Sequence, residues 1–62
     1  MTREEAREHL LAGGYITHPM IKGKTLAMLG DRIVVVQNGF RYGHAFNTNE
    51  EYAQGWEKVE GR

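Results

Sequence analysis

Two turn signals, eight residues apart, constrain this chain more than any other feature of its sequence. Gly30-Asp31 and Asn38-Gly39 each separate two segments that are rich in β-branched and aromatic residues. Both dipeptides suit two-residue hairpin turns, and Asn-Gly is the stronger signal because both residues tolerate positive φ in a type I′ turn. The sequence therefore predicts a β-meander of three antiparallel strands, over residues 24–29, 32–37 and 40–46.

A helix and a short strand are predicted ahead of this meander. Thr2-Arg3-Glu4-Glu5 has the pattern of a capping box, in which the threonine and the second glutamate cap each other's backbone amides. Gly13-Gly14 ends the helix that begins there, since glycine accepts the left-handed conformation. Tyr15-Ile16-Thr17-His18 predicts a strand that stops at Pro19, and a loop follows over residues 20–23.

A second helix and a last strand are predicted after the meander. Thr48-Asn49-Glu50-Glu51 repeats the capping pattern, and Gly55 ends the short helix that it begins. Residues 56–60 then return as a strand at a sheet edge. We therefore expect a single α+β domain over residues 1–62, with an N-terminal helix packed on a small antiparallel β-meander sheet and a short helix before the last strand.

The two tight turns fix the pairing of the predicted strands, so their side chains can be assigned to faces. One face is bulky and forms the expected core under Ala6 and Leu10 of the first helix. It carries Leu26, Met28, Ile33, Val35, Phe40, Tyr42, His44 and Phe46. The opposite face carries Thr25, Ala27, Leu29, Arg32, Val34, Val36, Arg41, Gly43 and Ala45. Most of these are small, and no second long helix covers them, so we predict an oligomer interface or a ligand wall here.

Self-association is the expected way for so short a chain to gain buried area. A domain of this size buries only about 60% of the surface that its unfolded chain exposes. Without cysteine the chain forms neither disulfides nor thiolate metal sites, and its three histidines lack the spacing of a metal-binding pair. We therefore expect a homo-oligomer with no metal and no cofactor.

Charge and hydropathy argue against two classes of partner. Eight basic residues balance eight acidic ones, so the chain lacks the positive footprint of a general nucleic-acid-binding protein. No apolar run approaches the ~20 residues of a membrane span, and the N-terminus lacks the apolar centre of a signal peptide. The absence of cysteine fits a reducing compartment. We expect a cytosolic protein that does not act at a membrane.

No catalytic constellation is visible, and we do not expect an enzyme. The chain has neither cysteine nor serine, and its four threonines fit helix caps and strands. Phosphate-loop and dinucleotide-binding patterns are absent, and Gly13-Gly14 ends a helix instead of leading into one.

Arg41 is the best single candidate for a binding residue. On the small-residue face a buried, unpaired cation would be costly, and an interface or a ligand anion would pair with it. His18 stands at a predicted strand end, where it is either a donor to a ligand or an exposed or singly satisfied histidine. Lys24 borders the predicted loop and either joins the site or is solvated. We expect His44 and Trp56 to belong to the core.

The whole chain resembles a group of small phage-encoded proteins. It opens with EEAREHLLAGGYITHP and closes with NTNEEYAQGWEKVE, on either side of the predicted meander. The group includes the second family of Thoeris anti-defence proteins. Its members typically open with an E-E-A helix and close with an acidic short helix and a D-W-E signature. Glu4-Glu5-Ala6 matches the opening, and Gly55-Trp56-Glu57 stands in the place of D-W-E.

This resemblance implies a function and a set of binding residues. Proteins of that family are viral sponges, which sequester the cyclic ADP-ribose-type signal of a host immune TIR enzyme between the subunits of a homo-oligomer. The chain departs from the family pattern where paired arginines often precede proline, since Thr17 and His18 stand there. It also has Ile21 where a tryptophan often follows. The ligand-binding residues expected here are Arg41, His18 and Lys24 as donors, Tyr42 or Tyr15 as a stacking surface, and Thr17.

We therefore expect a phage counter-defence protein that acts in the host cytoplasm. It would bind and sequester a nucleotide-derived immune signal, of cyclic nucleotide or cyclic ADP-ribose type, without cleaving it. The alternative is a small protein-binding inhibitor of a host defence enzyme, similar to an anti-CRISPR protein, that docks through a sheet face or an open edge strand. A structural or accessory phage protein is the third hypothesis.

Overall fold

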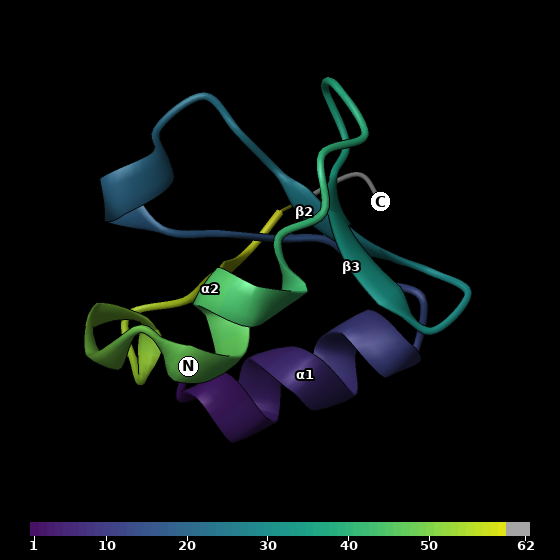
Figure 1. The fold of residues 1–62 in the computed structure, drawn as a ribbon. Coiled ribbons are helices and arrows are strands. Elements are labelled where there is room, and N and C mark those ends of the chain that lie inside the picture. Colours follow the sequence, from purple (N-terminus) through teal and green to yellow (C-terminus); the bar gives the residue numbers. More distant parts are fainter. Residues whose placement is uncertain (60–62) are drawn as a thin grey trace.

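A four-stranded antiparallel sheet with helices packed on one of its faces forms the fold (Figure 1), in a computed structural model that describes residues 1–59. The elements in chain order are α1 (Arg3–Leu11), β1 (Ile16–Thr17), the 3₁₀ helix η1 (Pro19–Ile21), β2 (Leu26–Leu29), β3 (Arg32–Val35), α2 (Gly43–Thr48), the 3₁₀ helix η2 (Glu50–Tyr52) and β4 (Glu57–Lys58). The strand order is β3-β2-β1-β4, which places β4 at an edge. The predicted α+β class is confirmed, as is the short helix before the last strand.

The predicted capping box starts α1. The Glu5 amide donates to Thr2 Oγ1 at 3.2 Å, and the Thr2 amide donates to Glu5 Oε1 at 2.9 Å. These bonds satisfy two of the amides that a helix start leaves without partners. They also favour the ionised carboxylate, and the pKa of Glu5 is lowered mainly by the backbone hydrogen bond at Thr2. Gly13 follows the helix at φ +94°, as the Gly-Gly signal predicts.

The first predicted hairpin is confirmed. Leu26 pairs with Val35 and Met28 with Ile33 across the Gly30-Asp31 turn. This register turns Leu26, Ile33 and Val35 into the core.

The predicted strand over residues 40–46 is wrong. Only one isolated bridge, Val34 to Arg41, joins this segment to β3, and the chain then turns into α2. The expected two-residue turn is replaced by a wider one, because the Val35 amide donates to the Phe40 carbonyl and Gly39, not Asn38, takes the positive φ. The helix places Phe46 in the core, and burial of this side chain stabilises the helical conformation.

The formation of α2 corrects three further expectations. His44, expected in the core, is exposed on the helix surface. Ala45, expected on the small-residue face together with Gly43, packs against the core. Thr48 ends α2 instead of capping a helix, and its Oγ1 donates to the His44 carbonyl at 2.7 Å.

The helix cap predicted at Thr48 lies one residue later. Asn49 Oδ1 accepts from the Glu51 amide at 2.9 Å and so starts η2. The predicted last strand shortens to β4, and residue 60 lies outside the described part of the chain.

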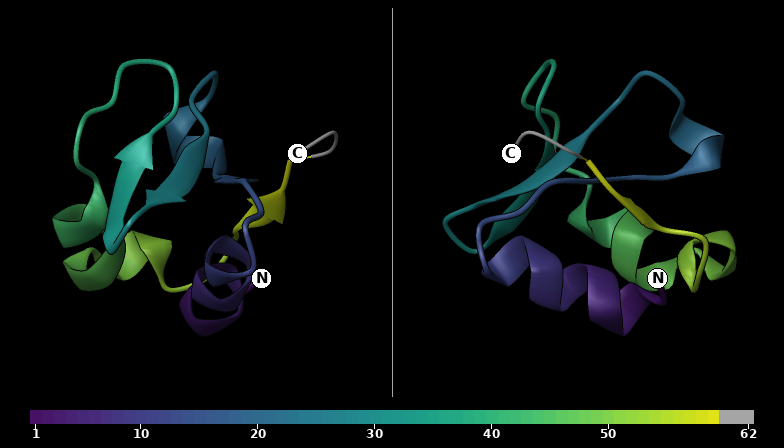
Figure 2. Two further views of the ribbon diagram at one scale, coloured as in Figure 1. Left: turned by 90° about the vertical axis from the view of Figure 1, so that its right-hand side faces the viewer. Right: turned by 180° about the vertical axis from the view of Figure 1, so that it is seen from behind.

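The core lies between the sheet and the helices (Figure 2), where α1 crosses β1 and β2 and α2 lies against β3. Its largest fully buried side chains are Trp56, Phe46, Leu10, Ile16, Leu26 and Val35. Trp56 and Leu10 therefore take the core positions predicted for them. No helix within residues 1–59 has the length and apolarity needed to cross a membrane.

Gly14 is expected to be intolerant of a side chain. A Cβ at this position would overlap the imidazole Nε2 of His9. Overpacking of this kind costs about 1–3 kcal/mol, so we expect Gly14→Ala to lower the free energy of unfolding by that amount in urea denaturation. Gly43→Ala is the matched control, since a Cβ there meets nothing within 4 Å and helices favour alanine.

Shortening the clashing partner should reverse this loss in part. We expect His9→Ala combined with Gly14→Ala to be more stable than the sum of the two single changes predicts. Strict additivity, or a Gly14→Ala variant as stable as the parent, would contradict the packing of these two residues.

Candidate functional site

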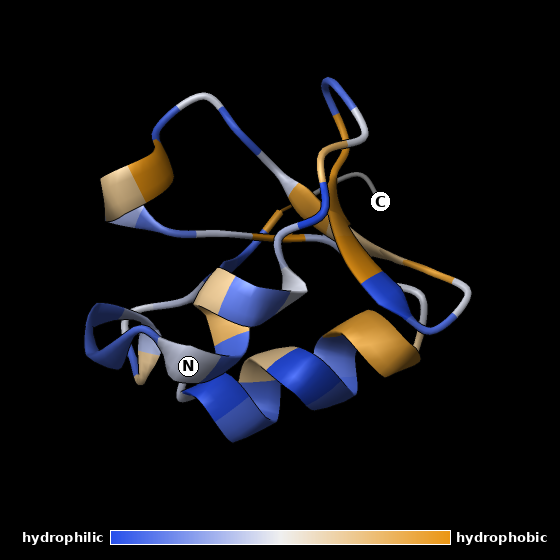
Figure 3. Cartoon of the chain, in the orientation of Figure 1, coloured by the Kyte–Doolittle hydropathy of each residue, from blue (hydrophilic) through white to orange (hydrophobic). Residues whose placement is uncertain are grey.

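The outer face of the sheet is the candidate site. Both α-helices pack on the opposite face (Figure 2), and no helix within residues 1–59 covers this one. The strands β2 and β3 are strongly apolar except for Arg32, at the start of β3 (Figure 3). The sequence-based expectation that one sheet face has no cover from the chain's own helices is therefore confirmed for β2 and β3.

One cross-strand row on this face brings a cation and an aromatic ring into line. Val34 pairs with Ala27 on one side and with Arg41 on the other. Since Ile16 pairs with Leu26, the preceding residue, Tyr15, lies level with Ala27. Directly paired residues of an antiparallel ladder point to the same side. Arg41, Val34, Ala27 and Tyr15 thus form one row, about three strand spacings or ~14 Å long.

Arg41 is the exposed end of this row. Its backbone is held in place by the Val34 bridge, and the next amide, of Tyr42, donates to the Ile33 carbonyl at 2.7 Å. No hydrogen bond or ion pair within residues 1–59 holds the guanidinium. Its five donors are therefore directed by the backbone to the sheet face and are available to an anion.

Thr17 and Lys24 are in contact, but the contact is with the backbone carbonyl of the lysine and not with its side chain. Thr17 Oγ1 donates to the Lys24 carbonyl at 2.8 Å. Thr17 lies on the outer face, since it follows the buried Ile16 in β1, while Lys24 is exposed on the loop before β2. The hydroxyl therefore anchors this loop, and the Lys24 ammonium extends from it.

His18 lies inside the molecule, and the strand-end position explains why. Side chains alternate along β1, so Ile16 and His18 turn inward. The Met20 amide donates to His18 Nδ1 at 3.2 Å, and Nε2 lies 2.9 Å from the Gln54 carbonyl. Because Nδ1 accepts from an amide, Nε2 is the ring nitrogen that donates, and its partner is the Gln54 carbonyl. Neither ring nitrogen is directed at the outer face.

Tyr42 is also directed inward. Its hydroxyl lies 2.7 Å from the hydroxyl of Tyr52, and the two rings are 5.9 Å apart. Burial raises the pKa of Tyr52 to about 12, and the hydrogen bond with Tyr42 adds to the effect. Tyr42 therefore belongs to a partly buried polar pair, and of the two predicted stacking residues only Tyr15 lies on the outer face.

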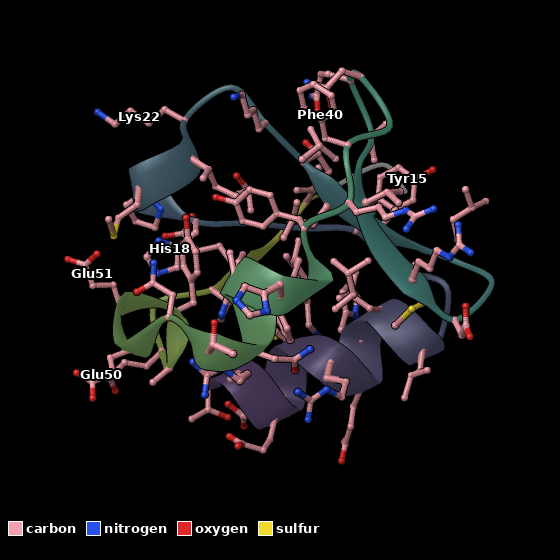
Figure 4. The ribbon with its side chains drawn as sticks, viewed as in Figure 1. Tyr15, His18, Lys22, Phe40, Glu50 and Glu51 are labelled. Carbon is pink, nitrogen blue, oxygen red and sulfur yellow. The ribbon has the colours of Figure 1, made fainter. Side chains whose placement is uncertain are left out.

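Charged groups are distributed unevenly over the molecule. The two α1 arginines bond inward: Arg3 donates to the carbonyls of Phe46 at 2.7 Å and Asn49 at 2.6 Å, and Arg7 donates to Asn47 Oδ1. The carboxylates of α1 and η2 stay in solvent; they are Glu4, Glu5, Glu8, Glu50 and Glu51. The sheet side carries Lys22, Lys24, Arg32 and Arg41, with Asp31 and Glu57 near its edges. Figure 4 shows Lys22 extending from the end of η1, on the side of the molecule away from α1, and Glu50 extending from η2. A chain of zero formal net charge thus presents a mostly basic region around the candidate site.

Phe40 is a candidate that the sequence assigned to the core. It is 68% exposed on the turn between β3 and α2, on the side of the molecule that also carries Tyr15 (Figure 4). The turn places it beyond the reach of the helices, next to Arg41. The Asn-Gly signal showed that a turn occurs here, but the assumed turn length gave Phe40 the wrong surroundings.

A shallow hollow of about 350 Å³ lies beside α1. It is lined by Met1, Glu5, Glu8, His9 and Lys58. Within residues 1–59, no group of three or more histidines and carboxylates is placed to hold a metal ion. Two carboxylates and one ammonium make this hollow a poorer match for an anion than the outer face.

Comparison with protein-family models gave no match for this chain, and neither the curated proteins nor the solved structures gave a significant one.

Proposed function

We propose that the chain is a phage counter-defence protein that binds a nucleotide-derived immune signal on the outer sheet face and holds it without cleaving it. The observation that carries this proposal is the row from Arg41 to Tyr15. A guanidinium suits a phosphate, and a phenol ring suits a base. The small side chains of Val34 and Ala27 between them allow a flat ligand to approach the sheet.

The resemblance to the second Thoeris anti-defence family supplies the ligand class. A cyclic nucleotide or a cyclic ADP-ribose-type molecule carries both a base and anionic phosphates, so it is matched by a ring and a cation on one surface. We propose that the protein acts stoichiometrically in the host cytoplasm, lowering the concentration of free signal.

We also propose that the protein is a homo-oligomer in which the outer face meets a second copy. The chain is short, and no helix within the described residues 1–59 covers the outer face of the apolar strands β2 and β3. Light scattering coupled to size-exclusion chromatography tests this proposal, and a strict monomer at high micromolar concentration would refute it.

Isothermal titration against a panel of cyclic dinucleotides, cyclic trinucleotides and cyclic ADP-ribose isomers tests ligand binding. We expect one class to bind, and we expect Arg41→Ala to weaken binding by about tenfold or more, because a charge-assisted hydrogen bond contributes about 1.5–3 kcal/mol. Lys58→Ala is the control, since Lys58 lines the hollow on the helix side. The bound nucleotide should be recovered intact after the protein is denatured.

If the protein is folded and oligomeric but no nucleotide of the panel binds to it, the sponge proposal is refuted. The exposed Phe40, with the 44% exposed Val36 in the same turn, favours a second candidate function, the protein-binding inhibitor of a host defence enzyme. An exposed aromatic side chain is a common anchor in protein interfaces. In that case Phe40→Ala, and not Arg41→Ala, should abolish capture of one stoichiometric host protein.

A further inference from the structure

The wide turn between β3 and α2 holds an exposed Asn-Gly pair in a reactive arrangement. The Phe40 amide donates to Asn38 Oδ1 at 2.9 Å, which folds the side-chain carbonyl back over the following peptide. Gly39, at φ +77°, has nothing within 4 Å of the place where a Cβ would stand. The Asn38 carbonyl is thus polarised by a hydrogen bond, and Gly39 has no side chain of its own to crowd its amide nitrogen.

We propose that Asn38 is a site of spontaneous deamidation in the native protein. The amide nitrogen of Gly39 loses its proton and attacks Asn38 Cγ, forming a new C–N bond. The bond from Cγ to Nδ2 then breaks, and Nδ2 takes up a proton and leaves as ammonia. Water opens the resulting five-membered imide at either carbonyl, which gives aspartate or isoaspartate. No reactant other than water is required.

One hydrogen bond must open before this step. The Gly39 amide donates to the Val35 carbonyl at 2.6 Å. All residues of the turn from Val36 to Phe40 are exposed, so the turn has little buried surface to resist a local opening. Proximity in the chain then favours the ring closure, because the attacking nitrogen and the carbonyl are already held together.

The chain contains its own matched control for this chemistry. Asn49 makes the same kind of turn, with its Oδ1 accepting from the Glu51 amide at the same distance of 2.9 Å. The residue that follows Asn49 is Glu50, whose side chain crowds the attacking nitrogen and which is fixed at the start of η2. Two asparagines with equal side-chain hydrogen bonds therefore differ in the residue that would act as nucleophile.

Deamidation would change the surface around Arg41. It adds a negative charge to a chain of zero formal net charge, within the turn that positions Phe40 and Arg41. Isoaspartate also lengthens the backbone by one carbon between Val35 and Phe40, whose hydrogen bond of 2.8 Å closes the turn. A consequent fall in anion binding at Arg41 rests on the proposed function, whereas the deamidation itself does not.

Mass spectrometry of the full chain, aged in mildly alkaline buffer and then digested, tests the proposal. We expect the rate of amide-to-acid conversion, followed by its mass gain, to be about tenfold or more higher at Asn38 than at Asn49. We also expect isoaspartate at position 38. The Asn38→Gln variant should show no conversion in this turn. Circular dichroism before ageing verifies that the variant and the parent are equally folded.

Two outcomes would overturn the proposal. Equal rates at the two asparagines would show that glycine gives no advantage in the folded chain. An intact Asn38 in the native protein, with rapid conversion in a urea-unfolded sample, would show that the turn protects the residue. Both readouts are independent of ligand binding, so a failed nucleotide titration leaves this test unaffected.

Discussion

Replacement of Trp56 by alanine is expected to leave most of the protein unfolded. Trp56 is 1% exposed, and its ring centroid lies 4.9 Å from that of His18 and 5.1 Å from those of Phe46 and Tyr52. Removal of such a side chain costs about 3–5 kcal/mol. A chain of this length has a total stability of roughly 3–9 kcal/mol, so the loss is comparable to the whole.

A phenylalanine at this position separates packing from hydrogen bonding. The Trp56 Nε1 donates to the Tyr52 carbonyl at 2.7 Å. Trp56→Phe keeps most of the ring but leaves this carbonyl without its partner, so we expect a smaller loss of about 1–3 kcal/mol. Urea unfolding followed by circular dichroism measures both variants.

Phe40→Ala is the control for both tryptophan variants, because it removes an exposed aromatic side chain and should change stability by less than about 0.5 kcal/mol. A Trp56→Ala variant as stable as the Phe40→Ala variant would show that the ring cluster is not the centre of the core.

The segment over residues 40–46 shows where prediction from the sequence fails. Phe40, Tyr42, His44 and Phe46 alternate as in a half-buried strand, but Tyr42, Ala45 and Phe46 also have the spacing of a helix face. Local pattern does not decide between the two. Contacts distant in sequence favour the helix. Phe46 is buried in the core, and Arg3, forty-three residues before it, donates from its guanidinium to the carbonyls of Phe46 and Asn49 at the end of α2.

Arg41 lies on its predicted face even though the predicted strand over residues 40–46 is wrong. The predicted partner of Tyr42 was Val35, which implies that Val36 faces Arg41, whereas Arg41 in fact pairs with Val34. The register therefore differs by two residues. Because side chains on a strand alternate with a period of two, such a shift leaves Arg41 on its predicted face. Arg41 remains on the outer face although its strand is reduced to one bridge.

The inward direction of His18 could have been predicted from the sequence. If Ile16 is a core residue, the same alternation turns His18 inward and Tyr15 and Thr17 outward. This alternation places His18 in the interior and Tyr15 and Thr17 on the outer face, although all three were predicted to bind a ligand. What no local pattern supplies is the second partner of the buried imidazole. Met20 lies only two residues after His18, but Gln54 lies thirty-six residues away in the sequence, in the turn before Trp56.

Replacement of His18 by leucine is expected to cause the second-largest loss of stability. Leucine fills part of the space between Tyr52 and Trp56, but it leaves the Met20 amide and the Gln54 carbonyl without partners. Each buried unsatisfied group costs about 1–3 kcal/mol, so we expect a total loss of about 2–4 kcal/mol in urea unfolding after partial hydration of the two groups. Loss of two edge-to-face ring contacts at 4.9 Å adds to this cost.

Two conservative variants separate the bonds of the imidazole. The Oδ1 of asparagine occupies the position of His18 Nδ1, so His18→Asn should keep the Met20 bond and lose the Gln54 bond. The Nε2 of glutamine occupies the position of the imidazole Nε2, so His18→Gln should do the reverse. Each is expected to lose about half as much stability as His18→Leu, since each leaves one group unpaired.

The same two variants decide whether His18 contributes to ligand binding. A buried structural role predicts that His18→Asn and His18→Gln lose stability while the remaining folded protein binds nucleotide with unchanged affinity. A donor role at the ligand predicts the opposite, with full stability and weakened binding. The second result would mean that the imidazole turns outward in solution, and the binding face would then extend past β1 to the start of η1.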